Sequence, residues 1–155
     1  MQRKNHLLNT FSICLISSTL ILCFLSTTVH AKSINKDEVN IRSEPNTTST
    51  VLYKAPLGYP IIIEKESKGW VYFRDWEDNK GWVHKPLVSD IKTAVILVDK
   101  ANVRNSPNEK AKVVTKAEVG EIYKILEKKG NWVHIGYYHG GSSVGWIRSD
   151  LVFGQ

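Results

Sequence analysis

The chain has 155 residues and a formal net charge of +6, of which the basic pair Arg3 and Lys4 supplies two, leaving +4 for the rest. The later lysines are interspersed with acidic residues, which is more typical of a solvated surface than of a nucleic-acid-binding patch. Both cysteines, Cys14 and Cys23, lie in the first 31 residues, so the remainder has no disulfide, no cysteine nucleophile and no thiolate metal ligand.

Residues 1–31 have the layout of a signal peptide. Two basic residues are followed by an apolar run over residues 11–25, and Ala31 is the small residue after which a signal peptidase would cut. Serine and threonine interrupt the run, which makes it a poor permanent membrane span, so an uncleaved anchor is the less favoured alternative. A large residue precedes each cysteine, which argues against a lipoprotein. We therefore expect an exported protein of the periplasm, or one secreted or associated with the cell wall, with no stable membrane span after cleavage.

After the signal, the chain contains two copies of one sequence unit. The octet VNIRSEPN, residues 39–46, returns 62 residues later as ANVRNSPN, with Asn, Arg, Pro and the final Asn in the same places. The match continues through a Trp-Val pair at that offset, and a later Gly-Trp pair matches at an offset of 64. The two extra residues fall among turn-forming residues, so we expect the insertion in a hairpin loop between strands that keep their register.

Each copy is predicted to be all-β. Residues 59–64, 70–74 and 121–126 are short runs rich in β-branched and aromatic side chains, and most are bounded by turn-forming residues. No helical stripe of useful length interrupts them. Five or six short strands in about 50 residues bury little as an open sheet, so a closed or half-closed barrel is expected.

Alternation along the strands assigns side chains to two faces. The residues predicted to face the core are Val71, Phe73, Val83, Val133, Ile135 and Ile147. The residues predicted to face the other way are Trp70, Tyr72, Trp82, Trp132, His134 and Trp146.

The repeated motifs resemble those of bacterial SH3 domains, here in tandem. They are Asn-[Ile/Val]-Arg-x-x-Pro, a Gly 13 residues after the Pro, a Trp-Val strand and a closing Gly-Trp-[Val/Ile] strand followed by Leu-Val. The resemblance covers residues 39–88 and 101–152, and residues 71–89 are similar to the subset found in short periplasmic proteins that carry only such barrels. It implies two small SH3-like β-barrels, in residues 32–90 and 101–155. It also implies a targeting or binding role, in several family members for peptidoglycan or its peptide cross-links.

The segment between the copies, residues 91–100, is apolar rather than rich in Gly, Ser or Pro, so it is not a flexible linker. The corresponding segment ahead of copy one, residues 32–36, is mostly polar, so we expect the apolar run not to belong to the repeat. It is predicted to lie in the contact between the barrels or to close the first barrel as its last strand. In either case the barrels should be docked.

The repeated arginines, Arg42 and Arg104, are predicted to brace the first turn of each barrel by donating to carbonyls, with a direct ligand role as the alternative. Pro45 and Pro107 preset the turn that follows. Two barrels also offer two sites, and two weak sites on one rigid unit gain in effective concentration on a repetitive polymer.

The aromatic residues are the candidate ligand groups. The main role expected for the four tryptophans that occur in both copies is packing, because a buried Trp removes on the order of 200 Å² from water. Alternation predicts that they face away from the core, so a ligand-binding role is the alternative. Trp76 has no counterpart in copy two and lies in a polar loop, whose equivalent holds Tyr137, Tyr138 and His139. The ligand-binding candidates are therefore Trp70, Tyr72, Trp76, Trp82, Trp132, Tyr137, Tyr138 and Trp146.

No motif for catalysis, metal binding or a cofactor is found, and none is expected. Three histidines remain after the signal, none at metal-ligand spacing, and Asp75 in the polar loop is expected to be solvated. The sequence thus predicts a non-enzymatic module that binds peptidoglycan or its peptides. The alternative is a scaffold for an exported protein such as a cell-wall enzyme. Nucleic acid is not an expected partner, and nothing in the sequence indicates the oligomeric state.

Overall fold

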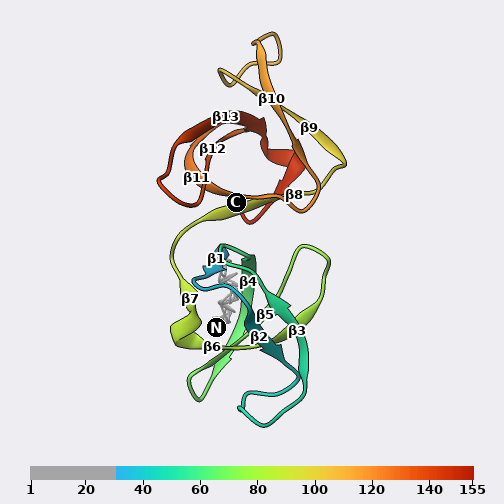
Figure 1. The fold of residues 1–155 in the computed structure, drawn as a ribbon, viewed down its shortest axis with the longest axis vertical. Helices are drawn as coiled ribbons and strands as arrows, with labels where there is room; N and C mark the ends of the chain where they lie inside the picture. The colour runs from blue at the N-terminus through green and yellow to red at the C-terminus, as the bar shows by residue number, and fades with distance from the viewer. Residues whose placement is uncertain (1–30) are drawn as a thin grey trace, which may run out of the picture.

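The computed structural model describes residues 31–155 and contains two antiparallel seven-stranded sheets, one in each half of this range (Figure 1). The signal peptide predicted for residues 1–31 lies outside the described residues, apart from Ala31, which begins the first strand. The first sheet contains β1 (Ala31–Ile34), β2 (Val39–Arg42), β3 (Val51–Ala55), β4 (Pro60–Ser67), β5 (Trp70–Arg74), β6 (Lys80–His84) and β7 (Val88–Ser89). The second contains β8 (Thr93–Ile96), β9 (Lys100–Arg104), β10 (Val113–Glu118), β11 (Ile122–Lys129), β12 (Trp132–Gly136), β13 (Ser143–Arg148) and β14 (Val152–Phe153).

The two sheets have the same strand order. It is β3-β2-β6-β5-β4-β1-β7 in the first and β10-β9-β13-β12-β11-β8-β14 in the second. Strand β1 thus corresponds to β8, β2 to β9, and so on to β7 and β14. A single 3-10 turn precedes the last strand of each sheet, η1 (Lys85–Leu87) and η2 (Ser149–Leu151). The prediction of two tandem all-β units built on one plan is confirmed.

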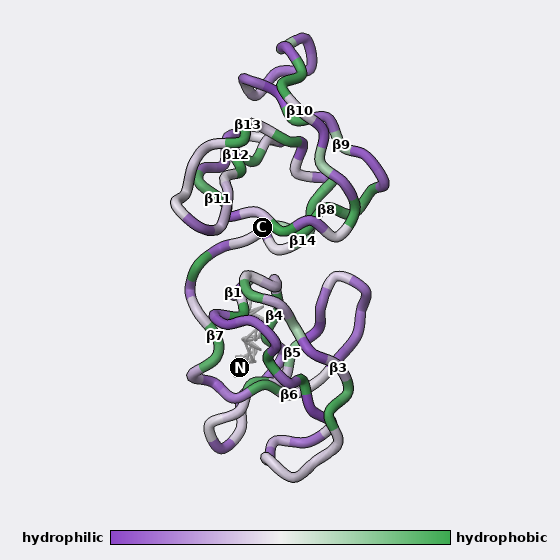
Figure 2. The backbone as a smooth tube through the Cα atoms, in the orientation of Figure 1, coloured by the Kyte–Doolittle hydropathy of each residue, from purple (hydrophilic) through white to green (hydrophobic). Residues whose placement is uncertain are grey.

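Each sheet wraps around its own hydrophobic core. The six side chains predicted from alternation to face inward, on β5, β6, β12 and β13, are each at most 1% exposed, which confirms the assignment. Figure 2 shows the hydrophobic residues on the strands and a hydrophilic tip on the β9–β10 hairpin. Since no cysteine is present after residue 31, these two cores hold the barrels together by burial.

The apolar run between the copies is a strand of the second barrel. Strand β8 pairs with β11 and β14, as β1 pairs with β4 and β7, so the two strands are counterparts. The expectation that this run lies outside the repeat is therefore wrong. Ala94 and Ile96 belong to the core of the second barrel, whereas Thr93 and Val95 are buried on the opposite face of the strand. A strand buried on both faces is apolar throughout, which conceals its relation to the more polar β1.

The two barrels are docked, as predicted. The Thr93 hydroxyl donates to the Gly58 carbonyl at 2.6 Å in a buried position. Ile122, at the start of β11, packs against the core of the first barrel, and the Arg74 guanidinium lies 5.9 Å from the centroid of the Phe153 ring. Contacts from β8, β11 and β14 therefore fix the second barrel on the first.

Candidate functional site

Each barrel has a groove beside its first turn, and the two grooves are built from matching positions. The first groove has a volume of about 480 Å³ and the second about 540 Å³. Four residue types line both: Asn and Arg from the second strand of the barrel, Trp from the fifth strand and Leu from the 3-10 turn. They are Asn40, Arg42, Trp70 and Leu87 in the first groove, and Asn102, Arg104, Trp132 and Leu151 in the second.

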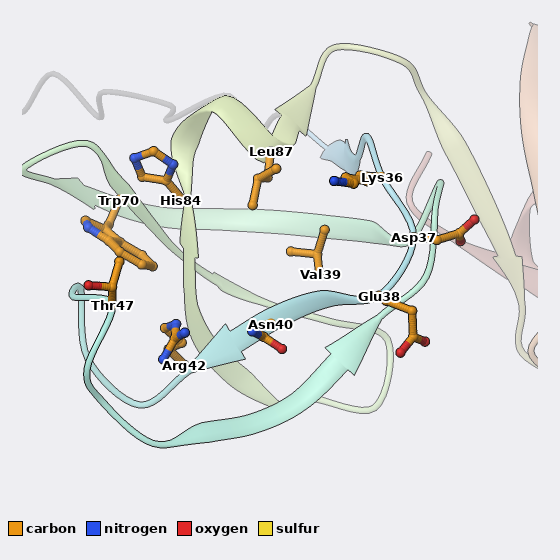
Figure 3. Close-up of a pocket in the computed structure, with 10 residues that line it drawn as sticks. All are labelled: Lys36, Asp37, Glu38, Val39, Asn40, Arg42, Thr47, Trp70, His84 and Leu87. Carbon is orange, nitrogen blue, oxygen red and sulfur yellow. The ribbon is translucent and has the colours of Figure 1, made fainter.

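Figure 3 shows the first groove with its aromatic residues at one end and its acidic residues at the other. Trp70 begins β5 and lies beside His84 at the end of β6, with 5.3 Å between the ring centroids. Asp37 and Glu38 come from the turn between β1 and β2 and lie beyond Val39. The groove therefore has Trp70, which is only 9% exposed, and His84 at one end and two carboxylates at the other.

The arginines of the grooves also hold the first turn of each barrel. Arg42 Nη1 donates to the Ser49 carbonyl at 2.7 Å, and Arg104 Nη1 donates to the Ala111 carbonyl at 2.6 Å. This is the geometry that the turn-bracing interpretation expects. Asn46 supports the same turn, because its side-chain oxygen accepts from the backbone N–H of Ser49 at 2.7 Å. Since both arginines also line the grooves, bracing and ligand contact are compatible.

The second groove differs in its charged residues. Glu109 and Arg148 occupy the positions of Thr47 and His84, and Arg148 Nη1 donates to Glu109 Oε1 at 3.0 Å. The Arg148 Nε and Nη2 groups donate to Asp150 at 2.9 and 2.8 Å. The bond from Arg148 lowers the pKa of the Asp150 carboxyl, and the bond to Asp150 raises the pKa of Arg148. The two grooves thus share a framework and differ in charge.

Three of the aromatic candidates, Tyr72, Trp82 and Trp146, form two ring pairs outside the residues that line the grooves. The Tyr72 and Trp82 rings lie 5.1 Å apart, and Lys65 Nζ lies 4.7 Å from the centroid of the Tyr72 ring. In the second barrel His134 stacks on Trp146 at 4.7 Å. These residues do not line either groove, so the structure groups Trp70 with Arg42, and Trp132 with Arg104, but leaves the other outward tryptophans elsewhere.

The loop between β5 and β6 is built around a buried carboxylate. Asp75 is only 1% exposed, so the expectation that it is solvated is wrong. Its Oδ2 accepts from the hydroxyls of Tyr53 at 2.9 Å and Tyr59 at 2.8 Å, and its Oδ1 accepts from the backbone N–H groups of Glu77 and Asn79. Burial, together with the bond to Asp75, raises the pKa of both tyrosines. The Asn79 side-chain amide also donates to Oδ2, at 3.3 Å. A carboxylate with five donors is stable without solvent, and this loop is therefore structural.

Trp76 is more buried than its polar neighbours in the sequence indicate. It is half-buried and packs against the core of the first barrel, so the polar loop does not leave its ring in solvent. The sequence does contain an indication that Asp75 is buried: three residues of copy one are all replaced together in copy two. Tyr53, Tyr59 and Asp75 occur together in copy one, and none of the three is retained at the equivalent positions of copy two.

The equivalent loop of the second barrel places its two tyrosines differently. Tyr137 is 58% exposed, with its ring 6.3 Å from that of Tyr123. Tyr138 lies against the first barrel, because a Cβ added at Gly58 would come within 2.9 Å of the Tyr138 ring. Tyr137 therefore remains available to a ligand, whereas Tyr138 contributes to the contact between the barrels.

Within residues 31–155, no group of three or more His, Cys, Asp or Glu side chains is placed to hold a metal ion. The same part of the chain contains no helix with the length and hydrophobicity of a membrane span.

Comparison with known proteins gives matches in both halves of the chain. A family model described as "Bacterial SH3 domain" matches residues 35–90, and a second model with the same description matches residues 99–153. The putative N-acetylmuramoyl-L-alanine amidase YrvJ of Bacillus subtilis is 26% identical over 156 residues, which cover 90% of this chain and 29% of that protein. The probable cell wall amidase LytH of Staphylococcus epidermidis is 34% identical over 61 residues, 39% of this chain and 21% of its own.

This chain thus spans less than a third of the length of either relative. Among solved structures, NlpC2 from Trichomonas vaginalis is 16% identical, with a TM-score of 0.38, over 83% of this chain and 49% of its own. NlpC1 from the same organism is 18% identical, with a TM-score of 0.34, over 81% of this chain and 45% of its own.

Proposed function

Since the chain belongs to the bacterial SH3 domain family, with one domain in each half, we propose that it is a binding module of the bacterial cell envelope. Its ligand in this proposal is peptidoglycan or the peptides of peptidoglycan. The protein is exported and acts in the periplasm or at the cell wall.

The repetition of the groove is the observation that carries this proposal. The same Asn, Arg, Trp and Leu line a groove of similar volume in both barrels, although the loops around them differ. An aromatic face suits a sugar ring or an apolar peptide side chain, while Asn and Arg supply donors for amide and carboxylate oxygens. Two such grooves on docked barrels match a polymer in which sugars and peptides recur, because the second contact is made at high effective concentration.

The similarity to one protein named as a putative N-acetylmuramoyl-L-alanine amidase and one named as a probable cell wall amidase supports the same ligand. The match covers less than a third of each relative, so those proteins have ample length outside the matched region. A module shared between amidases of that name and this chain fits a common task of binding the wall rather than cutting it.

We also propose that the chain is not an enzyme. Amide hydrolysis requires an activated nucleophile or a metal-bound water, and neither groove is lined by a cysteine or by a cluster of metal ligands. The histidine of the first groove, His84, is replaced by Arg148 in the second. A residue needed for catalysis would not be expected to differ in this way if both grooves did the same work.

A second candidate function is a scaffold for an exported protein, such as a cell-wall enzyme. Strands β3 and β10 end the order of their sheets, and each has two exposed apolar residues at matching positions. These are Val51 and Leu52 on β3, and Val113 and Val114 on β10. An edge strand with exposed apolar side chains can pair with an extended segment of another protein.

The test is co-sedimentation of residues 31–155, which contain every strand of both barrels, with purified peptidoglycan sacculi at physiological salt. A double variant, Asn40→Tyr with Asn102→Tyr, fills both grooves from exposed strand positions where tyrosine is well tolerated. Thr115→Tyr, at an exposed position of β10 outside the grooves, is the matched control. We expect the parent and Thr115→Tyr to sediment with sacculi and the double variant to stay in solution.

Failure of the parent to sediment would refute the peptidoglycan proposal and favour the scaffold. Sedimentation of all three chains would retain the ligand but exclude the grooves as its site. Circular dichroism of each variant checks that the barrels remain folded.

A further inference from the structure

The two grooves have the same framework, but the first is balanced in charge and the second has an excess of basic side chains. In the first groove Lys36 and Arg42 are balanced by Asp37 and Glu38, with His84 counted as neutral. In the second groove three basic side chains, Lys100, Arg104 and Arg148, face the single acid Glu109. A groove with an excess of positive charge favours an anionic ligand group, and the first groove has no such excess.

Arg148 is held in place for such a group. Asp150, which lies outside the groove, accepts from Nε and Nη2 at 2.9 and 2.8 Å and so fixes one side of the guanidinium. Nη1 remains on the groove side, where it donates to Glu109 Oε1 at 3.0 Å. The Arg148 side chain is thus oriented by one carboxylate and presents Nη1 to a second.

Glu109 reaches Arg148 from a different part of the barrel. It lies in the loop between β9 and β10, 39 residues before Arg148 at the end of β13. Both side chains are largely exposed, and exposed ion pairs of this kind contribute little to stability, so the contact opens at low cost. The first barrel has no equivalent ion pair, because Thr47 and His84 stand at these positions.

We propose that the second groove binds a carboxylate of a peptide ligand on Arg148, at the place that Glu109 occupies in the free protein. Glu109 is a competitor for this place, and the two domains therefore differ in specificity: the second takes the acidic part of the ligand and the first a neutral part. This inference rests on the proposed function and deepens it by naming the ligand group. Peptidoglycan peptides carry free carboxylates on their acidic and terminal residues, so they supply the required chemistry.

The test uses residues 31–155 and two probes: a disaccharide-tetrapeptide muropeptide, and the same muropeptide with its carboxylates converted to amides. The indole N–H resonances of Trp70 and Trp132 report on the first and second groove in NMR titrations. We expect the Trp132 resonance to give a Kd at least about fivefold lower for the acidic probe than for the amidated one, since a charge-assisted bond replaces a neutral one. The Trp70 resonance should respond equally to both.

Three variants separate the competitor from the binding residue. Glu109→Gln should lower the Kd of the acidic probe at the second groove about twofold to fivefold, which is the range that an exposed ion pair spans. Arg148→Gln should raise it about tenfold or more. Glu127→Gln changes the net charge equally on exposed β11, outside the groove, and should leave the Kd unchanged.

Equal affinity of the two probes at Trp132, or no gain from Glu109→Gln, would overturn the inference while leaving the proposed function standing. No response of either tryptophan to either probe would overturn both. The Glu109→Gln result does not depend on the stability of Arg148→Gln, because Glu109 is an exposed loop residue.

Discussion

The two barrels hold their β5–β6 and β12–β13 loops in different ways on the same framework of strands. In the first barrel the loop is organised by the buried Asp75 carboxylate and its five donors. In the second, the equivalent residue Tyr137 is largely exposed, and the loop includes Gly140 and Gly141 at positive φ. The comparison teaches that the core-facing strand positions and the turn glycines define the barrel, while loop chemistry can change completely.

Asp75→Ala should produce the largest difference between the barrels. It removes the acceptor of two tyrosine hydroxyls and two backbone N–H groups in a buried place, which we expect to cost the first barrel about 3–4 kcal/mol. The matched change in the second barrel, Tyr137→Ala, should stay within about 0.5 kcal/mol because the side chain is exposed. Urea unfolding followed at the amides of Val71 and Val133 measures each barrel separately. Similar losses for the two variants would contradict the account.

A glycine pair tests the docking of the barrels. Gly58 and Gly120 are equivalent turn residues with φ of +78° and +81°, so alanine at either position pays about 1 kcal/mol of left-handed strain. At Gly58 the new Cβ would also lie 2.9 Å from the Tyr138 ring of the other barrel, whereas nothing lies within 4 Å at Gly120. We therefore expect Gly58→Ala to cost about 1–2 kcal/mol more and to loosen the docking.

Thermal unfolding of the two glycine variants gives the difference in stability, and small-angle X-ray scattering gives the separation of the barrels. If Gly58→Ala and Gly120→Ala lose the same free energy of unfolding and the scattering is unchanged, Tyr138 does not contribute to the contact between the barrels.

The response to alkali should also differ between the barrels. Burial raises the pKa of Tyr53 and Tyr59 in the first barrel, and of Tyr123 in the second, above the ordinary 10.0. The unfolded chain then ionises before the folded one, so stability is intact below pH 10 and falls as the pH rises above it. Two tyrosines set a limiting slope of about 2.7 kcal/mol per pH unit for the first barrel, and one sets about 1.4 for the second.

Urea midpoints measured between pH 9 and pH 12, with the same two amide reporters, compare these slopes. Equal slopes of stability against pH in the two barrels would mean that the Asp75 network does not keep Tyr53 and Tyr59 protonated.

The barrel framework could be predicted from the sequence because it depends on local alternation. Val71 and Phe73, and their counterparts in copy two, follow a period of two that the sequence displays directly. Strand β8 could not be assigned in this way, since burial of Thr93 and Val95 depends on a neighbouring barrel that the local pattern does not contain.

The candidate site was predicted only in part. Trp70, Trp132 and the two arginines could be named because they recur, but their assembly into a groove with Asn40 and its counterpart depends on pairing between strands distant in the sequence. Asp75 was misjudged because its donors, two tyrosines of other strands among them, are brought to it only by the folded barrel.

The central claim is that the two grooves bind peptidoglycan together, and single-groove variants test it most directly. Binding isotherms of residues 31–155 on sacculi would be compared for the parent, Asn40→Tyr, Asn102→Tyr and the double variant. Joint binding predicts that each single variant loses at least about tenfold in apparent affinity, because the remaining groove no longer gains from effective concentration, and that the double variant does not bind. Single variants that bind like the parent would contradict the account.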